Sequence, residues 1–120
     1  MFEPVEGLPE SVVAVRGIGR LTGEDYRSVL LPLIDRATVD GHKARLYLEL
    51  GEGFEGYDPS AMVADTRLGL SHLASFERMA VVTDAEWLTH AVHLFGPLIP
   101  GEVRVFPVAE ASAARDWVTA

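Results

Sequence analysis

The sequence contains no cysteine, so disulfide bonds, thiol nucleophiles and thiolate metal ligands are excluded. Basic residues are scarce, with 10 Lys and Arg against 18 Asp and Glu and a formal net charge of −8. A chain of this charge repels phosphate backbones, so we expect no nucleic-acid partner. No apolar run approaches the roughly 20 residues that span a bilayer, and the first residues lack the basic start of a signal peptide. A cytoplasmic protein is therefore expected.

What is present suits one globular domain over residues 1–120, because 48% of the residues are hydrophobic and 23% are charged. The most informative segment is Phe76–Phe106. In it, Met79–Thr83 predicts a strand, and Thr83-Asp84-Ala85-Glu86 has the pattern of a capping box that opens a helix. Phe95-Gly96-Pro97 ends this helix, and Val103–Phe106 predicts the next strand. Strand, helix and strand in this order are typical of a parallel α/β sheet.

The rest of the chain extends the same pattern. Further strands are predicted at Phe2–Val5, Val12–Leu21 and Ala44–Leu50. Further helices are predicted after Thr22-Gly23-Glu24-Asp25, after Asp58-Pro59 and over Ala109–Val118. The order ββαβαβαβα predicts a single α/β domain with a mixed five-stranded sheet, about four helices and an antiparallel first strand at or near an edge.

Several local features carry their own expectations. Gly17 and Gly19 predict a bulge or a close backbone approach in the second strand. Pro32 removes one amide from the first helix and is expected to kink it. Gly51–Tyr57 is expected to be a loop. The inward residues of the second and last helices are expected to be Met62, Val63, Thr66, Leu70 and Leu73, and Ala113, Ala114, Trp117 and Val118.

Four segments together resemble the SpoIIAA-like proteins, which are small bacterial domains related in fold to STAS domains and similar to the lipid-binding CRAL-TRIO fold. These segments are Glu6-Gly7-Leu8-Pro9, Phe76-Glu77-Arg78, Val81-Val82-Thr83-Asp84-x-x-Trp87, and Phe95-Gly96-x-x-Ile99-Pro100-Gly101-Glu102-Val103-Arg104-Val105-Phe106. The resemblance covers essentially the whole chain and implies a STAS-type fold. It also implies a role in apolar-ligand binding or membrane association.

The resemblance implies a second role as well. In anti-sigma-factor antagonists, a serine of an Asp-Ser-Ser-Gly-like motif begins the helix after the third strand and is phosphorylated by a partner kinase. Ser60 is the hydroxyl nearest the corresponding position, but the motif around it is absent. Ser60 is therefore a candidate phosphorylation site, and the alternative is a serine that only stabilises the helix start.

Three patterns point to other chemistry. Gly51-Glu52-Gly53-Phe54-Glu55-Gly56 matches GxGxxG, but its two glutamates would lie beside bound phosphates, so a surface loop is favoured over a nucleotide site. His90 and His93 lie three residues apart on one helix face and form at most half of a metal site, to which His72 could contribute. No GxSxG elbow is present, and the acid pairs Glu52 with Glu55 and Asp65 with Glu86 suggest no catalysis. We expect neither an enzyme nor a cofactor.

The third predicted helix and its following loop contain more apolar residues than one buried stripe requires. The surplus either is sealed as core or forms an exposed patch that binds a ligand, a partner or a membrane. We predict a non-catalytic binding module for a small apolar molecule or lipid held between the second and third helices, with membrane or homodimer contacts through the same surface. The predicted site residues are Met62, Trp87, Leu94, Phe95, Leu98 and Ile99. The alternative is a regulatory protein-interaction domain with Ser60 near the contact surface.

Overall fold

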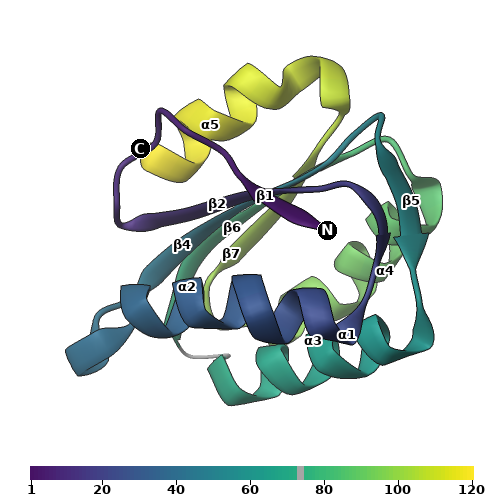
Figure 1. The fold of residues 1–120 in the computed structure, drawn as a ribbon. Coiled ribbons are helices and arrows are strands. Elements are labelled where there is room, and N and C mark those ends of the chain that lie inside the picture. The colour runs from purple at the N-terminus through teal and green to yellow at the C-terminus, as the bar shows by residue number, and fades with distance from the viewer. Residues whose placement is uncertain (73–74) are drawn as a thin grey trace.

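Five strands form one mixed sheet in the order β1-β2-β4-β6-β7 (Figure 1). The structure, a computed structural model, describes residues 1–72 and 75–120, and the side chains of 65, 66 and 68–72 are also outside the description. The strands are β1 (Phe2–Pro4), β2 (Val12–Gly17), β4 (Ala44–Leu50), β6 (Phe76–Thr83) and β7 (Glu102–Phe106). β1 pairs antiparallel with β2, and the other neighbours pair parallel. The mixed sheet with an antiparallel first strand at its edge is therefore confirmed.

Helices cover both faces of this sheet. They are α1 (Gly23–Asp25), η1 (Tyr26–Leu30), α2 (Leu31–Ala37), η2 (Val39–Gly41), α3 (Pro59–His72), α4 (Glu86–Phe95), η4 (Gly96–Leu98), η5 (Val108–Glu110) and α5 (Ala111–Thr119). Figure 1 shows α5 on one face and α1, α2, α3 and α4 on the other. Of the helices in the described part of the chain, none combines the length and the apolar character that crossing a bilayer requires.

A small second sheet pairs β3 (Gly19–Leu21) with β5 (Phe54–Tyr57) in parallel. The single strand predicted over Val12–Leu21 and the loop predicted over Gly51–Tyr57 are therefore wrong. The chain leaves the main sheet after Gly17, where a Cβ would lie 2.5 Å from Leu50 Cδ2, and it turns at Gly19, which has a φ of +67°. The expected close approach is confirmed at Gly17, and the expected irregularity is confirmed at Gly19, where the register of the pairing with β5 shifts.

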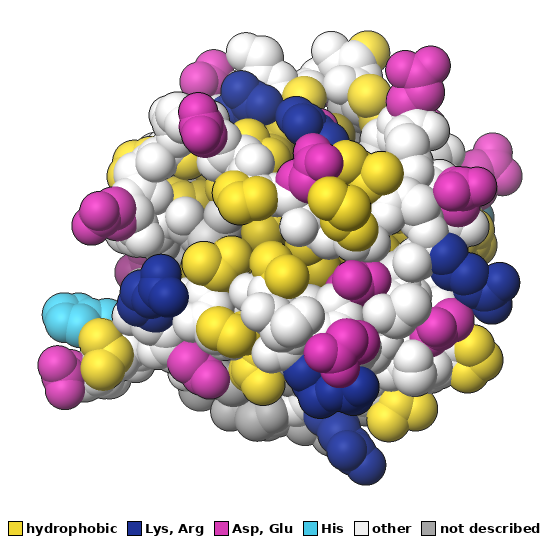
Figure 2. Space-filling view, viewed as in Figure 1, with side chains coloured by type: hydrophobic (Ala, Val, Ile, Leu, Met, Phe, Trp, Pro, Cys, Tyr) yellow, Lys and Arg dark blue, Asp and Glu magenta, His cyan; other side chains and the backbone are white. Residues whose placement is uncertain are grey.

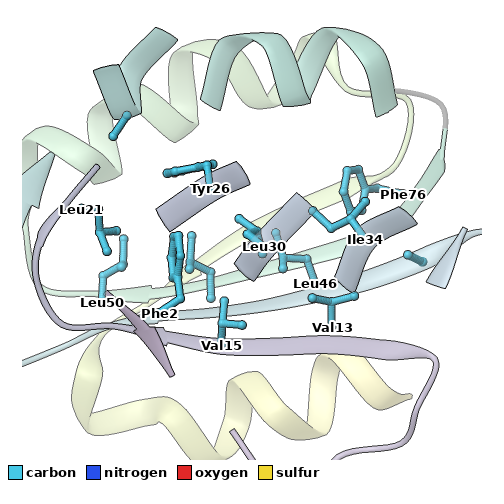
Figure 3. Close-up of a cluster of buried hydrophobic side chains, with 13 residues drawn as sticks. Phe2, Val13, Val15, Leu21, Tyr26, Leu30, Ile34, Leu46, Leu50 and Phe76 are labelled. Atoms are coloured by element: carbon cyan, nitrogen blue, oxygen red, sulfur yellow. The ribbon is translucent and has the colours of Figure 1, made fainter. Parts of the chain in front are cut away.

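Each face of the main sheet has its own hydrophobic core. Figure 3 shows the larger core, in which side chains of β1, β2 and β4 meet Tyr26, Leu30 and Ile34 of the first helix. The smaller core lies under α5 and includes Tyr47, Phe106, Ala114 and Val118. The inward positions predicted for the last helix are confirmed for Ala114 and Val118, which are fully buried, and for Trp117, which is half-buried against the same core, but Ala113 is exposed.

The first predicted helix, which the structure divides into α1, η1 and α2, begins at a capping box and continues through a π-helical turn. Its predicted capping box is confirmed, because the Thr22 hydroxyl accepts from the Asp25 amide at 3.2 Å and Asp25 Oδ2 accepts from the Thr22 amide at 2.9 Å. Next to Pro32, where a kink was expected, the preceding segment is π-helical, and the Leu31 amide donates to the Tyr26 carbonyl five residues earlier. Proline has no amide hydrogen to donate. The π-helical turn, which has five residues between hydrogen-bonded groups instead of four, therefore lies directly before Pro32.

The capping box predicted at Thr83 is wrong. Thr83 is still part of β6 and only 2% exposed, and its hydroxyl accepts from the Ala85 amide at 3.1 Å. Ala85 is the N-cap of α4 and makes no side-chain cap hydrogen bond. Asp84 instead accepts from the Val108 amide at 3.0 Å, which ties the end of β6 to the segment after β7. Strand β6 ends at Thr83 as predicted and begins three residues earlier than predicted, and α4 begins only after Ala85, so the Thr83 hydroxyl caps no amide of this helix.

Candidate functional site

The third predicted helix is an apolar helix at the surface. None of the ten residues of α4, all of which the structure describes, is buried. Four large side chains here are at least half exposed, and we call them the α4 surface: Trp87 (50%), Leu94 (71%), Phe95 (59%) and, in η4, Leu98 (69%). Ile99, the remaining predicted residue of this segment, is half-buried. Such a cluster of exposed apolar side chains usually marks a binding surface.

Two different stripes of α4 explain this exposure. Leu88 packs against the larger core and holds the helix on the sheet. Trp87, Ala91 and Leu94 are spaced at i, i+4 and i+7, so they lie together on a second stripe beside the first. The helix therefore has one apolar stripe more than the core uses.

A chain of aromatic rings connects the α4 surface to the core. Trp87 packs edge-on against Tyr57 of β5 at 5.9 Å, and Tyr57 lies 6.3 Å from Tyr26 of η1. Tyr26 in turn packs against Phe2 at 5.3 Å. Tyr57 was not among the predicted site residues, because Gly51–Tyr57 was expected to be a loop and not to contain β5. Edge-to-face contacts of this kind hold Trp87 in place while half of its surface stays in water.

The second predicted helix places its residues differently from expectation. In α3, Ala61 is fully buried, whereas Met62 and Val63 are 58% and 53% exposed. The prediction that Met62 and Val63 face the core is therefore wrong. The physical reason is that the first turn of α3 packs on the start of α1, where a Cβ on Gly23 would lie 3.0 Å from the Ser60 carbonyl. The side chains of Thr66 and Leu70, also expected to face inward, lie outside the description, as does residue Leu73.

Ser60 connects the starts of two helices. Its hydroxyl accepts from the Gly23 amide at 3.0 Å and donates to Asp58 Oδ1 at 2.5 Å. Asp58 also accepts from the Ala61 amide at 3.0 Å, so it caps α3 as predicted. The hydrogen bonds from Ser60 and Ala61 lower the pKa of Asp58. Ser60 is exposed, yet its hydrogen bond from Gly23 connects α1 with α3, while its bond to Asp58 stays within the start of α3.

A groove separates the first helix from α3 beyond this contact. Its volume is about 490 Å³, within the size range of small-molecule pockets. Its described lining consists of Tyr26, Arg27, Leu31, Ser60, Val63, Ala64 and Arg67. The predicted ligand position was between the second and third helices, so this groove was not predicted. No sequence signal indicates this groove, because only the packing of the first helix against α3 brings Arg27 and Arg67 into one lining.

A crevice of about 470 Å³ lies where β4 and β6 end. Its lining includes Gly51 and Glu52 of the GxGxxG segment together with Asp84. The two carboxylates disfavour a phosphate group, and α3 begins only at Pro59, after the third glycine. The segment forms a turn, with the Phe54 amide donating to the Gly51 carbonyl at 3.1 Å, and then continues as β5. This geometry gives a nucleotide site no support.

The polar residues considered for metal binding and catalysis are scattered. His90 and His93 are both exposed on α4, and His72 and Asp65 lie outside the described side chains. Among the residues that the structure describes, no three His, Asp or Glu side chains come together as metal ligands would.

Comparisons with known proteins agree with this architecture. A family model described as SpoIIAA-like matches residues 12–119. The chain is also similar to a crystal structure from Shewanella loihica PV-4, an uncharacterised protein of the DUF3478 family with a SpoIIAA-like fold. The two share 25% sequence identity with a TM-score of 0.78, over 98% of this chain and 92% of the other. No curated protein matches the sequence. Because the family model covers most of the chain, the protein belongs to the SpoIIAA-like family.

Proposed function

We propose that this protein is a non-catalytic binding module for a small apolar molecule or lipid tail, and that the α4 surface takes the ligand. The observation that carries the proposal is that α4 keeps Trp87, Leu94, Phe95 and Leu98 at least half exposed. Removing apolar area from water contributes about 25 cal/mol per Å². A ligand that covers these side chains gains that free energy without any change of fold.

Two further features support a bound small molecule. Tyr57 holds the Trp87 ring edge-on at 5.9 Å, so one wall of the site is already ordered. Met62 is also exposed, and a flexible thioether adapts to ligands of different shape. The net charge of −8 disfavours an anionic membrane as the partner, because acidic surfaces repel anionic headgroups. A homodimer through the α4 surface would bury the same side chains.

Native mass spectrometry of the freshly purified protein, followed by organic extraction, is the first test. We expect a stoichiometric apolar molecule to accompany the chain. Titration with the uncharged fluorophore N-phenyl-1-naphthylamine then locates the site. Leu94→Ser and Trp87→Ala should weaken probe binding about fivefold or more. Val39→Ser is the matched control, because Val39 is 56% exposed in η2, away from α4. The proposal would be overturned if the purified protein carries no ligand and binds no probe, or if Val39→Ser weakens probe binding as much as the α4 variants do. A dimer mass that Leu94→Ser abolishes would assign the α4 surface to self-association.

The alternative is a regulatory domain of the anti-sigma-factor-antagonist type, favoured by the exposed position of Ser60 at the start of α3. A phosphate on Ser60 would break its hydrogen bonds with Gly23 and Asp58, so phosphorylation would separate α3 from α1. Ser60→Asp should then weaken binding to a kinase-like partner. Unchanged binding by this variant in a pull-down with such a kinase would remove the alternative.

A further inference from the structure

Strand β7 forms one edge of the five-stranded sheet, and its neighbour in that sheet is β6. In a parallel pair, a strand uses the amide and carbonyl groups of alternate residues, so the remaining groups of β7 point away from β6. Within the described part of the chain, no segment other than β6 makes a backbone hydrogen bond with β7. The outer edge of β7 is therefore open to another strand.

The two edges of the sheet differ in how they are protected. The opposite edge strand, β1, has three residues and ends in Pro4, and both shortness and proline hinder pairing at an edge. Strand β7 has five residues, none of them proline, and its pairing with β6 shows no bulge. Of the two edges, β7 is therefore the one that can accept a further strand along its whole length.

One acidic and one basic side chain alternate along β7. Glu102 and Arg104 are two residues apart, so they lie on the same face of the sheet. The Arg104 guanidinium lies 5.3 Å from the centre of the Trp117 ring, and no carboxylate of the described residues pairs with it. Glu102 pairs with Arg78 at 3.2 Å but is 66% exposed. Both charges therefore remain accessible at the edge.

This spacing of charges is complementary to itself. Two identical strands that pair antiparallel are related by a twofold axis. If the axis passes by Val103, Glu102 of each copy lies opposite Arg104 of the other copy, and both cross-strand pairs are attractive. If the axis passes by Arg104, two guanidinium groups oppose each other. The charges therefore favour Val103 as the centre of the pairing.

The β7 edge also differs in charge from the molecule as a whole. The net charge of −8 repels two copies in general, and Figure 2 shows Asp and Glu side chains scattered over the side that carries α2. On β7, in contrast, Glu102 is accompanied by the guanidinium groups of Arg78 and Arg104. Two copies can therefore approach through this edge without bringing unpaired carboxylates together.

We propose that this protein forms a symmetric dimer in which the β7 strands of two copies pair antiparallel about Val103 and join two five-stranded sheets into one. The outward amides and carbonyls of β7 gain hydrogen-bond partners, and two Glu102–Arg104 pairs form across the axis. The proposal goes beyond the function proposed for the α4 surface, because it depends on β7 and not on Trp87 or Leu94.

Sedimentation equilibrium of the wild-type chain over a range of concentrations measures dimerisation. We expect Arg104→Glu to weaken the dimer about tenfold, because it replaces two attractive cross-strand pairs by two repulsive ones. Arg36→Glu is the matched control, since it makes the same change of charge at an exposed position of α2. A protein that stays monomeric at all concentrations, or equal weakening in both variants, would overturn the proposal. Thermal melts verify that each variant is folded.

Two complementary variants test the register. Arg104→Glu and Glu102→Arg each place like charges opposite one another in their own dimers. A mixed dimer of the two variants has attractive charge pairs at both positions. We expect native mass spectrometry to detect mixed dimers after the variants are combined, and little dimer of either variant alone. Failure to form the mixed dimer would contradict the pairing about Val103.

A cross-linking experiment tests the same register without changing any charge. The chain contains no cysteine, so a single introduced thiol is the only site of reaction. In Val103→Cys, the two thiols lie opposite each other across the axis, and a short bis-maleimide should link the copies. Ser112→Cys, at an exposed position of α5, is the control and should stay unlinked. Equal linking in both variants, or none in Val103→Cys, would refute the dimer.

The same measurements separate this proposal from the one for α4. Leu94→Ser should leave the dimer unchanged, because Leu94 is part of α4 and not of β7. Arg104→Glu should leave the binding of the neutral fluorophore unchanged. A dimer that is lost in Leu94→Ser and kept in Arg104→Glu would overturn the pairing through β7 and assign self-association to the α4 surface.

Discussion

At the scale of single residues, polar side chains in this protein act mostly as connections between elements. Ser60 joins α3 to α1, and Asp84 joins the end of β6 to the segment after β7. Glu49 of β4 accepts from Tyr47 at 2.7 Å and from Arg16 of β2, and lies 3.9 Å from Arg115 of α5. Serine, aspartate and glutamate are residue types common in catalytic sites, but Ser60, Asp84 and Glu49 here connect structural elements.

Ser60→Ala should lower the free energy of unfolding by about 1–2 kcal/mol, because the Gly23 amide loses its acceptor in a buried contact. Urea denaturation measures the change. Ser112→Ala is the control, since Ser112 is exposed on α5. A loss no larger than that of the control would mean that the Ser60 hydroxyl is free for modification.

Glu49 predicts a pH dependence of stability. Burial raises the pKa of Glu49, but the hydrogen bonds from Tyr47 and Arg16 and the charge of Arg115 outweigh it, so the pKa is lower than its ordinary value of 4.5. A carboxyl whose pKa is lowered by folding contributes stability above its unfolded pKa, and this contribution is lost as pH falls through the folded value. We therefore expect stability to decline below about pH 4.5.

Glu49→Gln should make this acid decline shallower, because the amide cannot titrate. Unfolding free energies measured between neutral pH and acid provide the comparison. The control is Glu110→Gln, which removes an exposed carboxylate. If both variants follow the wild-type curve, the Glu49 network does not contribute to the acid sensitivity.

At the scale of elements, glycines decide how closely strands and helices approach. Gly17 allows Leu50 to pack where a Cβ would clash, and Gly23 allows α1 to touch α3. Gly101 precedes β7, and a Cβ there would lie 2.4 Å from the Phe76 carbonyl oxygen. The backbone cannot give way as a flexible side chain can. The position directly before β7 therefore requires a residue without a Cβ.

Gly101→Ala should therefore destabilise the protein by about 1–3 kcal/mol through strain where β7 docks on β6. Gly51→Ala is the matched control, because its nearest contact would be an ordinary 3.8 Å to Val108. Thermal denaturation of both variants is the measurement. Similar melting temperatures for the two would show that the segment before β7 relaxes freely.

At the scale of the whole molecule, the sheet divides the protein into two unequal halves. One face is closed by α5, and the other carries α1, α2, α3 and α4 over the larger core (Figure 1). Both candidate binding surfaces lie on this second side. The two surfaces differ in composition: α4 has exposed apolar side chains, and the groove beside α3 has two arginines in its lining.

Leu94→Ser should change the unfolding free energy by no more than about 0.5 kcal/mol, since a surface substitution away from packed contacts is nearly neutral. Leu30→Ala, at a position only 1% exposed, should cost about 2–5 kcal/mol. Chemical denaturation of both variants provides the measurement. A large loss in Leu94→Ser would mean that the α4 surface is sealed as core in solution.

Local patterns predicted a large part of this fold. Strand β4 has the bounds expected from Ala44–Leu50, and Thr22 and Asp58 cap their helices as predicted. These elements were predictable because residues close in sequence determine them. The prediction of a Thr83 cap failed because Thr83 pairs with Leu50 of β4 and is buried at the end of β6, a long-range contact that the local pattern does not contain.

The sequence by itself determined the class of the protein: a cysteine-free acidic chain, an α/β element order and the apolar surplus of the third predicted helix. Periodicity and capping are short-range properties, so they are readable along the chain. Only the tertiary structure decided that β3 pairs with β5, that Met62 and Val63 are exposed, and that Arg27 and Arg67 share a groove. These features depend on contacts between segments far apart in the sequence, where packing rather than local preference selects the arrangement.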